Sequence, residues 1–153
     1  MSDDVVISPV IRQIMMLNLD NIINHVHSIC NTTISNLARE EKEHVTQTKN
    51  KIEEYVKQNY RRKITHADMN LHTGISRNPF CRFFQQHYKC TFVEYLTNFR
   101  LEKAVIMLKT TNKSMTIVAY ECGFESVNWF NNRFKKHKNM PPSMYRAQNK
   151  GNN

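Results

Sequence analysis

Hydrophobic residues recur at helical spacing along most of this 153-residue chain. Between residues 10 and 37 they follow intervals of four and three, which predicts one or two amphipathic helices. The more polar segment 38–48 is expected to form a solvated helix or a linker, and 49–60 a further helix with an apolar face. No segment is rich in strand signals, so the chain is predicted to be all-α. The stripe in 10–37 consists of Met15, Leu19, Ile22, Val26 and Ile29.

The pattern after residue 60 contains an internal repeat. The motif Ser-x3-Phe-x3-Phe occupies 76–84 and again 126–134. A matching segment precedes each copy: THADMNLHTG occupies 65–74, and SMTIVAYECG occupies 114–123. A repeated pattern of this kind predicts that one structural unit occurs twice.

The ends of the first helix in each copy can be assigned from capping residues. Thr65 and Ser114 are suitable N-caps, because their hydroxyl oxygens can accept backbone N–H bonds. Gly74 and Gly123 stand where a residue in the left-handed conformation would end a short helix. A short helix is therefore predicted between each cap and its glycine.

The second helix of each copy is expected to begin at a serine, Ser76 or Ser126. Pro79 falls at the third position of its helix, where no intrahelical N–H bond is lost. Each copy then consists of a helix, a short turn containing glycine and a second helix, which is the helix-turn-helix unit. The two units are predicted at about 65–88 and 114–138.

One long helix is predicted between the two units, over about 92–109. Thr91 and Glu94 form a T-x-x-E capping box at its start. A rigid helix of this length would set the separation of the two units. Its apolar stripe comprises Phe92, Tyr95, Leu96, Phe99 and Leu108.

Charge is unevenly distributed along the chain. Residues 1–48 contain three bases and six acids, whereas 49–153 contain the other 19 bases and seven acids, so the net charges are −3 and +12. A segment this basic attracts polyanions, nucleic acid first among them. A merely solubilising surface would mix both signs more evenly.

Composition argues against several other classes of protein. No apolar run approaches the ~20 residues that span a bilayer, and the N-terminus lacks the basic region of a secretory signal, so a cytoplasmic location is expected. The cysteines form no CxxC pair and are expected to be free thiols. His25, His27 and Cys30 lack a fourth ligand at zinc-finger spacing. No nucleophile–base set or phosphate-binding glycine loop is present, so no enzyme, cofactor or metal site is predicted.

The second helix of each unit has two chemically different faces. Phenylalanines at i and i+4 define a buried face, and the opposite face carries amides and cations without a carboxylate. In a major groove Arg suits guanine and Asn or Gln suits adenine, each good pair contributing roughly 1–3 kcal/mol of discrimination. The predicted base-reading residues are Asn78, Cys81, Arg82 and Gln85 in the first unit, and Val127, Asn128, Asn131, Asn132 and Lys135 in the second.

Phosphate contacts are predicted from basic residues around the units and from the N-termini of the two second helices. Arg100 is instead assigned a structural role, because it lies on the linker helix among apolar neighbours. The predicted phosphate contacts are Arg61, Arg62, Lys63, Ser76, Arg77, Lys103, Ser126, Lys136 and Lys138.

Residues 49–147 resemble the DNA-binding domain of AraC/XylS-type transcription regulators. The motifs GFES and PPxxYR are also similar to those of the short stand-alone members that regulate antibiotic-resistance and oxidative-stress genes. The residues that match the family signature are Phe92, Tyr95, Leu96, Arg100, Leu101, Leu108, Ile117, Ala119, Gly123, Phe124, Trp129, Phe130, Phe134, Lys135, Pro142, Tyr145 and Arg146.

The chain departs from the family pattern at a few positions. Asn70 replaces a small alanine in the first unit, and Pro79 and Cys81 give that unit an unusual reading face. Lys89 and Asn139 replace the glycine that usually follows each second helix. Asn tolerates the left-handed conformation better than Lys does. These departures affect the expected sequence preference and leave the expected fold unchanged.

The resemblance implies how the chain is organised and what it does. Residues 1–48 would be an N-terminal helical extension, 49–147 the DNA-binding domain, and 148–153 a disordered tail. Both units would insert a helix into successive major grooves of promoter DNA. The protein would be a bacterial activator that recruits RNA polymerase.

Other functions remain open at the level of sequence. The chain would alternatively be the C-terminal part of a larger regulator, or an interaction module in which residues 10–37 form a homodimer or dock a partner. A non-specific architectural DNA binder is a third alternative. It predicts equal affinity for unrelated duplexes at a fixed salt concentration.

Overall fold

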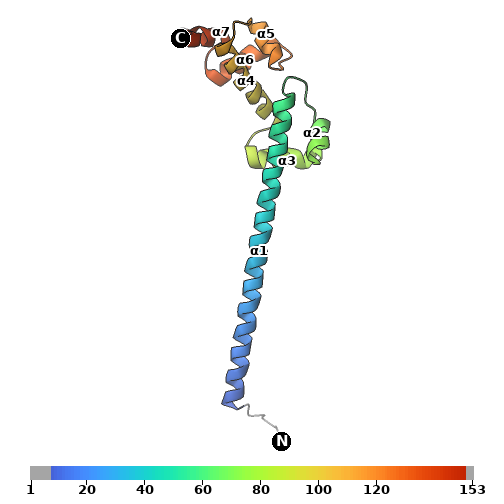
Figure 1. Ribbon diagram of the computed structural model, residues 1–153, viewed down its shortest axis with the longest axis vertical. Coiled ribbons are helices and arrows are strands. Elements are labelled where there is room, and N and C mark those ends of the chain that lie inside the picture. The colour runs from blue at the N-terminus through green and yellow to red at the C-terminus, as the bar shows by residue number, and fades with distance from the viewer. Residues whose placement is uncertain (1–7, 151–153) are drawn as a thin grey trace. The chain divides into compact units, whose positions relative to one another are not determined.

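The computed structural model describes residues 8–150, and within them it contains seven helices and no strand (Figure 1). The predicted all-α class is therefore confirmed. The chain divides into two compact parts between residues 47 and 48. We refer to them as the N-terminal segment, described from residue 8 to 47, and the C-terminal domain, described from residue 48 to 150. No helix within 8–150 combines the length and the apolar character that crossing a membrane requires.

Helix α1 spans Pro9–Asn59 and has 51 residues. The sequence pattern allowed several separate pieces here, but neither Pro nor Gly interrupts residues 10–59, and these two residues weaken helices most. Pro9 occupies the first helical position, where its missing N–H is not needed. In the N-terminal segment every side chain from residue 8 to 44 is exposed. Apolar residues outside the predicted stripe, such as Ile14 and Leu17, are exposed as well.

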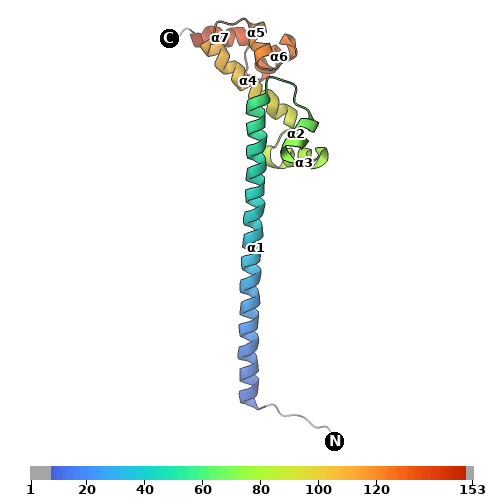
Figure 2. The ribbon, with the colours of Figure 1, turned by 45° about the vertical axis from the view of Figure 1, so that its right-hand side comes forward.

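The C-terminal domain begins with the last turns of α1 and continues through six further helices. Helices α2 and α3 form the first predicted helix-turn-helix unit, α5 and α6 form the second, and α4 is the predicted linker helix. Figure 2 shows α2 and α3 beside one end of α4, and α5 to α7 around the other. The bounds are α2 (His66–Thr73), α3 (Arg77–Tyr88), α4 (Phe92–Thr110), α5 (Met115–Glu121), α6 (Val127–Lys138) and α7 (Pro142–Lys150).

Each helix-turn-helix unit has its own hydrophobic core, and α4 contributes to both. The first half of α4 supplies Phe92 and Leu96 to the first core, and its second half supplies Leu101, Val105 and Leu108 to the second. The rest of the first core is Ile52, Val56, Met69, Phe80 and Phe84, and the rest of the second is Ala104, Val118, Ala119, Cys122, Phe124, Phe130 and Phe134.

Capping at the helix N-termini follows the predictions in most places. Thr65 and Thr91 each form a complete capping box, with Asp68 and Glu94 respectively. The Ser114 hydroxyl accepts a hydrogen bond from the backbone N–H three residues later, at 3.2 Å. These bonds satisfy N–H groups that have no partner within the helix.

Ser76 is an exception to the predicted capping. It precedes α3, but its side chain makes no capping hydrogen bond, whereas the Ser126 hydroxyl accepts one from Trp129 N–H at 3.4 Å. The physical reason is Pro79. Pro79 occupies the third helical position. In the other capped helices the residue at this position donates its backbone N–H to the N-cap side chain, but proline has no N–H to donate.

Four residues with positive φ end helices or follow them. Gly74 and Gly123 have φ of 76° and 85°, as their positions in the repeat predicted. Lys89 and Asn139 both adopt φ of 56° directly after α3 and α6. The left-handed conformation, which favours glycine, is thus adopted by a Lys and an Asn at these two positions.

The last helix was not anticipated from the sequence. Helix α7 begins at Pro142, a favourable first helical residue, and extends to Lys150, although a disordered tail was expected from residue 148. Tyr145 packs against the second core, with its ring centroid 5.5 Å from that of Phe134. Residues 151–153 of the expected tail lie outside the described residues.

Candidate nucleic-acid interface

The buried faces of α3 and α6 are formed by phenylalanines at the predicted positions. Phe80 and Phe84 are buried in the first unit, and Phe130 and Phe134 in the second. The ring centroid of Phe80 lies 5.5 Å from that of Phe92 on α4. Because these phenylalanines pack each helix against its core, the residues on the opposite side of each helix face outward.

On α3 all four predicted base-reading residues are exposed: Asn78, Cys81, Arg82 and Gln85. The Sγ atom of Cys81 lies 3.8 Å from Nε2 of His66 on α2. Arg82 forms no ion pair within the described residues, so its guanidinium is available to an external acceptor.

On α6 the predicted base-reading residues are less uniformly exposed. Asn128, Asn132 and Lys135 are exposed, whereas Asn131 and Val127 are half-buried. Val127 packs against the second core. The structure thus places the exposed amides and ammonium group of α6 on one face, and turns Val127 partly inward.

Most predicted phosphate contacts are exposed, but several already have partners within the chain. Lys138 Nζ lies 2.9 Å from Oε1 of Glu102, and Lys103 Nζ lies over the ring of Phe99 at 5.1 Å. Arg62 donates hydrogen bonds to Asn59 and Tyr55. The exposed members without such a contact among the described residues are Lys63, Ser76, Arg77 and Lys136, whereas the exposed Ser126 hydroxyl already caps α6.

Arg100 has the structural role predicted for it. It is buried in α4, where its Nε donates to the Tyr60 carbonyl at 2.7 Å and its Nη2 to the Arg62 carbonyl at 2.9 Å. Burial lowers the pKa of the guanidinium. These two bonds hold the basic segment between α1 and α2 against the linker helix.

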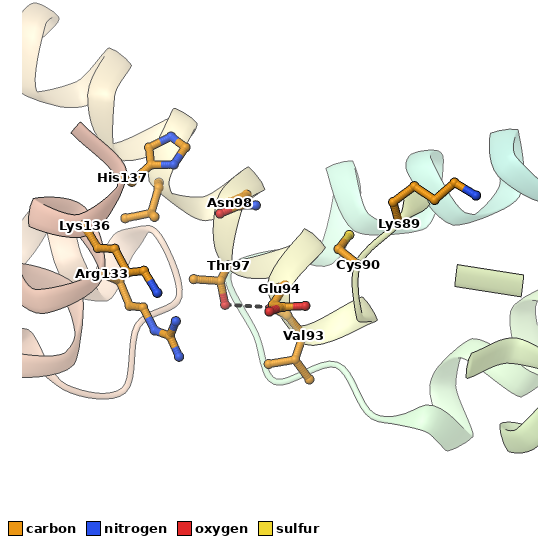
Figure 3. A pocket seen from close by; sticks show the side chains of 10 residues that line it. Lys89, Cys90, Val93, Glu94, Thr97, Asn98, Arg133, Lys136 and His137 are labelled. Atoms are coloured by element: carbon orange, nitrogen blue, oxygen red, sulfur yellow. Dashed lines mark hydrogen bonds between the residues drawn. The ribbon is translucent and has the colours of Figure 1, made fainter. Parts of the chain in front are cut away.

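The structure also reveals a groove that the sequence did not predict. It lies between the first half of α4 and the second half of α6, and its volume is about 370 Å³ (Figure 3). Arg133 and His137 on α6 and Asn98 on α4 face it and were absent from the predicted site. The remaining lining residues are Lys89, Cys90, Val93, Glu94, Thr97, Leu101 and Lys136.

Two comparisons decide the family. The helix-turn-helix domain family matches residues 71–148, more than half of the chain. A solved transcriptional regulator with an AraC-type DNA-binding domain, from Chromobacterium violaceum, is similar at a TM-score of 0.65 and 25% identity, over 71% of this chain and 96% of that chain. The chain belongs to the AraC family of DNA-binding transcription regulators.

The curated relatives are longer than the matched region. The transcriptional regulatory protein HptR of Staphylococcus aureus is 34% identical over 101 residues, which cover 66% of this chain and 40% of HptR. The uncharacterized HTH-type transcriptional regulator YdeC of Bacillus subtilis is 31% identical over 90 residues, 59% of this chain and 31% of YdeC. The match therefore spans well under half of each relative.

No group of three or more potential metal ligands occurs among residues 8–150. His25, His27 and Cys30 are all exposed on α1.

Proposed function

We propose that this chain activates transcription by binding double-stranded promoter DNA with α3 and α6 in successive major grooves on one face of the duplex. The observation that carries the proposal is the duplication. Two helix-turn-helix units each bury a row of phenylalanines and expose an opposite row with amide or cationic groups. Such groups can form bidentate hydrogen bonds with base edges in a major groove.

The linker helix supports the two-groove geometry. Helix α4 has 19 residues, which corresponds to about 28 Å at ~1.5 Å per residue. With the width of the helices packed at its two ends, the separation approaches the roughly 34–36 Å of one turn of B-DNA. A mismatch would be met by bending the DNA, at a cost of order 1–6 kcal/mol, or by release of one unit.

Activation through RNA polymerase rests on the family resemblance. The AraC-type family regulates transcription, and we extend that role to recruitment of the polymerase in the bacterial cytoplasm. Contact with the polymerase would be tested by transcription in vitro from a promoter that carries a selected site. Transcription that falls on addition of the protein would assign it to repression.

The DNA-binding proposal is tested by selection of bound duplexes from a random library, followed by affinity measurement. Inserting five base pairs between the two half-elements moves one of them to the opposite side of the helix. We expect this insertion to remove most of the specific affinity. Affinity that survives it would mean that one unit alone reads bases, or that a second chain supplies the other contact. Equal affinity for selected and random duplexes at fixed salt would identify a non-specific binder.

A second proposal concerns the N-terminal segment, which we infer to pair with a second copy of itself. Met15, Leu19, Ile22, Val26 and Ile29 follow the 4-3 spacing of a coiled-coil seam, and each is at least half exposed. Exposed apolar area on this scale marks an interaction site.

The chemistry around the stripe favours an identical partner. Asp20 is the only Asp, Glu, Lys or Arg between residues 13 and 38, so two copies could approach with little charge repulsion. We expect Ile22→Asp with Ile29→Asp to convert the full chain from dimer to monomer in sedimentation equilibrium. Asn24→Asp with Asn31→Asp adds the same charge outside the stripe and should leave the dimer intact. A wild-type chain that is monomeric at micromolar concentration would refute self-pairing and favour a different partner.

A further inference from the structure

We infer that the groove between α4 and α6 holds a phosphodiester of the DNA backbone, at the stretch between the two major-groove contacts. This inference rests on the proposed DNA-binding function and adds a contact to it. Most of the predicted phosphate contacts lie outside this groove, and Lys136 is the one that lines it. The central residue of the contact is Arg133, which was not predicted to contact DNA.

The groove brings cations and hydrogen-bond donors together from two helices. In Figure 3 the side chains of Arg133 and Lys136 extend from α6 on the side that faces Thr97 and Asn98 of α4. A volume of about 370 Å³ is ample for a phosphate group. Arg presents a planar fork that matches phosphate oxygens, and Lys adds a point charge.

The two cations of α6 are not neutralised by ion pairs. Among residues 8–150, neither Arg133 nor Lys136 has a carboxylate within ion-pairing distance. Arg133 instead lies over the ring of Trp129, with Cζ 5.6 Å from the centroid. This stacking leaves the edge of the guanidinium free to donate hydrogen bonds.

Glu94 is the acidic residue of the lining, and its carboxylate is already engaged. It accepts hydrogen bonds from the backbone N–H and the hydroxyl of Thr91, both at 2.9 Å. These bonds lower the pKa of Glu94, and the charges of Arg133 and Lys136 lower it further. One carboxylate therefore faces two cations, and the surplus positive charge attracts an anion. Lys89 adds a third cation at the far end of the lining, although in Figure 3 its ammonium points away from Arg133.

The groove borders the reading faces of both α3 and α6. On α6, Lys136 continues the i, i+4 row that begins with Asn128 and Asn132. Lys89 directly follows the last residue of α3 and also lines the groove, so the groove begins at the C-terminal end of that helix. A duplex that engages both reading faces would pass the groove with the backbone between its two major-groove sites. A phosphate held there would set the register of both helices at once.

The experiment uses the full chain and a duplex recovered by selection from a random library. Neutral methylphosphonate linkages are placed one at a time along each strand, and the affinity of each duplex is measured. For the wild-type chain we expect a loss of roughly tenfold at one or two linkages between the half-elements. Arg133→Gln with Lys136→Gln should weaken binding to the unmodified duplex and should make it insensitive to those same linkages. Its salt dependence should fall by about 0.9 in slope for each phosphate contact that is lost.

Lys51→Gln with Lys57→Gln is the matched control, since both side chains are exposed on α1 outside the groove. This variant removes the same charge and should keep the wild-type pattern of sensitive linkages. All four side chains are exposed, and circular dichroism at rising temperature would verify that both variants fold.

The possible outcomes separate the inference from the proposed function. A wild-type chain that selects no sequence would refute the proposed function. Specific binding with an unchanged linkage pattern in the Arg133/Lys136 variant would leave the function standing and overturn the phosphate contact. Inorganic phosphate is titrated into the DNA-free chain at constant ionic strength as a further arm. Saturable shifts of the amide signals of residues 133–137, together with an unchanged linkage pattern, would assign the groove to a free anion and likewise overturn the inference.

Discussion

Gly74 and Gly123 occupy the same place in the two helix-turn-helix units, yet their surroundings differ. Both adopt a left-handed backbone, with φ of 76° and 85°. A Cβ added to Gly74 would meet nothing within 4 Å, whereas one at Gly123 would clash with the carbonyl of Tyr60 and lie 2.9 Å from Nε of Arg100. The turn at Gly123 in the second unit is therefore packed against Tyr60, just after the end of α1, and against Arg100 on α4. The equivalent turn at Gly74 in the first unit has open space beside it.

Other equivalent positions differ in the same direction. Ala119 is fully buried on α5, whereas the matching Asn70 on α2 is exposed. The cap before α6 makes its hydrogen bond and the cap before α3 does not. Helix α7 also packs against the second core, through Tyr145.

The repeated sequence pattern specifies the helix-turn-helix motif in both units. The residues outside the repeat determine how extensively each unit is packed against the rest of the domain. The second unit packs against α4, against α7 and against the segment 60–62, whose backbone carbonyls accept hydrogen bonds from Arg100. The first unit depends on α4 and on the last turns of α1, through Ile52 and Val56. We therefore expect the first unit to adapt more readily to its half-site, and the second to stay in place.

The largest expected effect tests the two cores. Phe130→Ala and Phe80→Ala should each lower the free energy of unfolding by roughly 3–5 kcal/mol, because each removes a buried ring and leaves a cavity. Urea unfolding followed by circular dichroism measures both. For Phe130, the fluorescence of Trp129, the single tryptophan of the chain, gives a local signal in the second unit. A variant that unfolds like the parent would show that its phenylalanine is not buried.

The next effect sharpens the contrast between the glycines. Gly123→Ala should cost about 3 kcal/mol or more of unfolding free energy, because it combines a clash with the Tyr60 carbonyl and left-handed backbone strain. Gly74→Ala should cost only the strain, roughly 1–2 kcal/mol. The two midpoints in urea provide the comparison. Equal losses at both sites would mean that the residues around Gly123 move easily to accept a Cβ. That result would contradict the proposed difference in packing between the two units.

A third effect concerns DNA rather than stability. Asn132→Ala and Arg82→Ala should each cost roughly 1–3 kcal/mol at selected sites and relax the preference at one or two base pairs. Affinities for selected and random duplexes at the same salt separate base reading from charge. Losses of equal size on both kinds of duplex would assign these side chains to phosphate contacts. If the first unit is the more adaptable, Arg82→Ala should be the milder change.

The smallest effect tests the two serine caps. Ser126→Ala should lower the unfolding free energy by about 1 kcal/mol, the usual loss for an N-cap hydroxyl. Ser76→Ala should change it very little, since Ser76 makes no capping bond. Thermal unfolding of the two variants beside the parent is sufficient. A loss at Ser76 as large as that at Ser126 would refute the explanation through Pro79.

Local signals in the sequence were enough for most of the secondary structure of the C-terminal domain. The capping box of Thr91 and Glu94 located the start of α4, and Gly74 and Gly123 marked the ends of α2 and α5. Pro142 is a local signal for the start of α7, although the sequence pattern after it did not predict a helix. For Ser76 the decisive fact was also local, because a proline three residues later has no N–H for the cap.

The candidate site was only partly accessible to sequence reasoning. Helical periodicity separated the phenylalanine rows from the outward rows, and so it located the exposed Asn78, Arg82 and Asn132. It could not show that Val127 turns toward a core, because that depends on what packs beside α6. Nor could it show that Lys138 on α6 already contacts Glu102 on α4, because these two residues lie on different helices.

The sequence by itself determined the helices, the duplicated unit and the identity of the residues on each helix face. These properties depend on interactions between residues three or four positions apart, which are written directly into the order of the chain. The tertiary structure decided the groove where Arg133 meets the first half of α4, and the contact of Gly123 with Tyr60 and Arg100. Both bring together residues that lie more than twenty positions apart, and their approach depends on how α4 orients the two units. The periodicity of a single helix carries no information about that orientation.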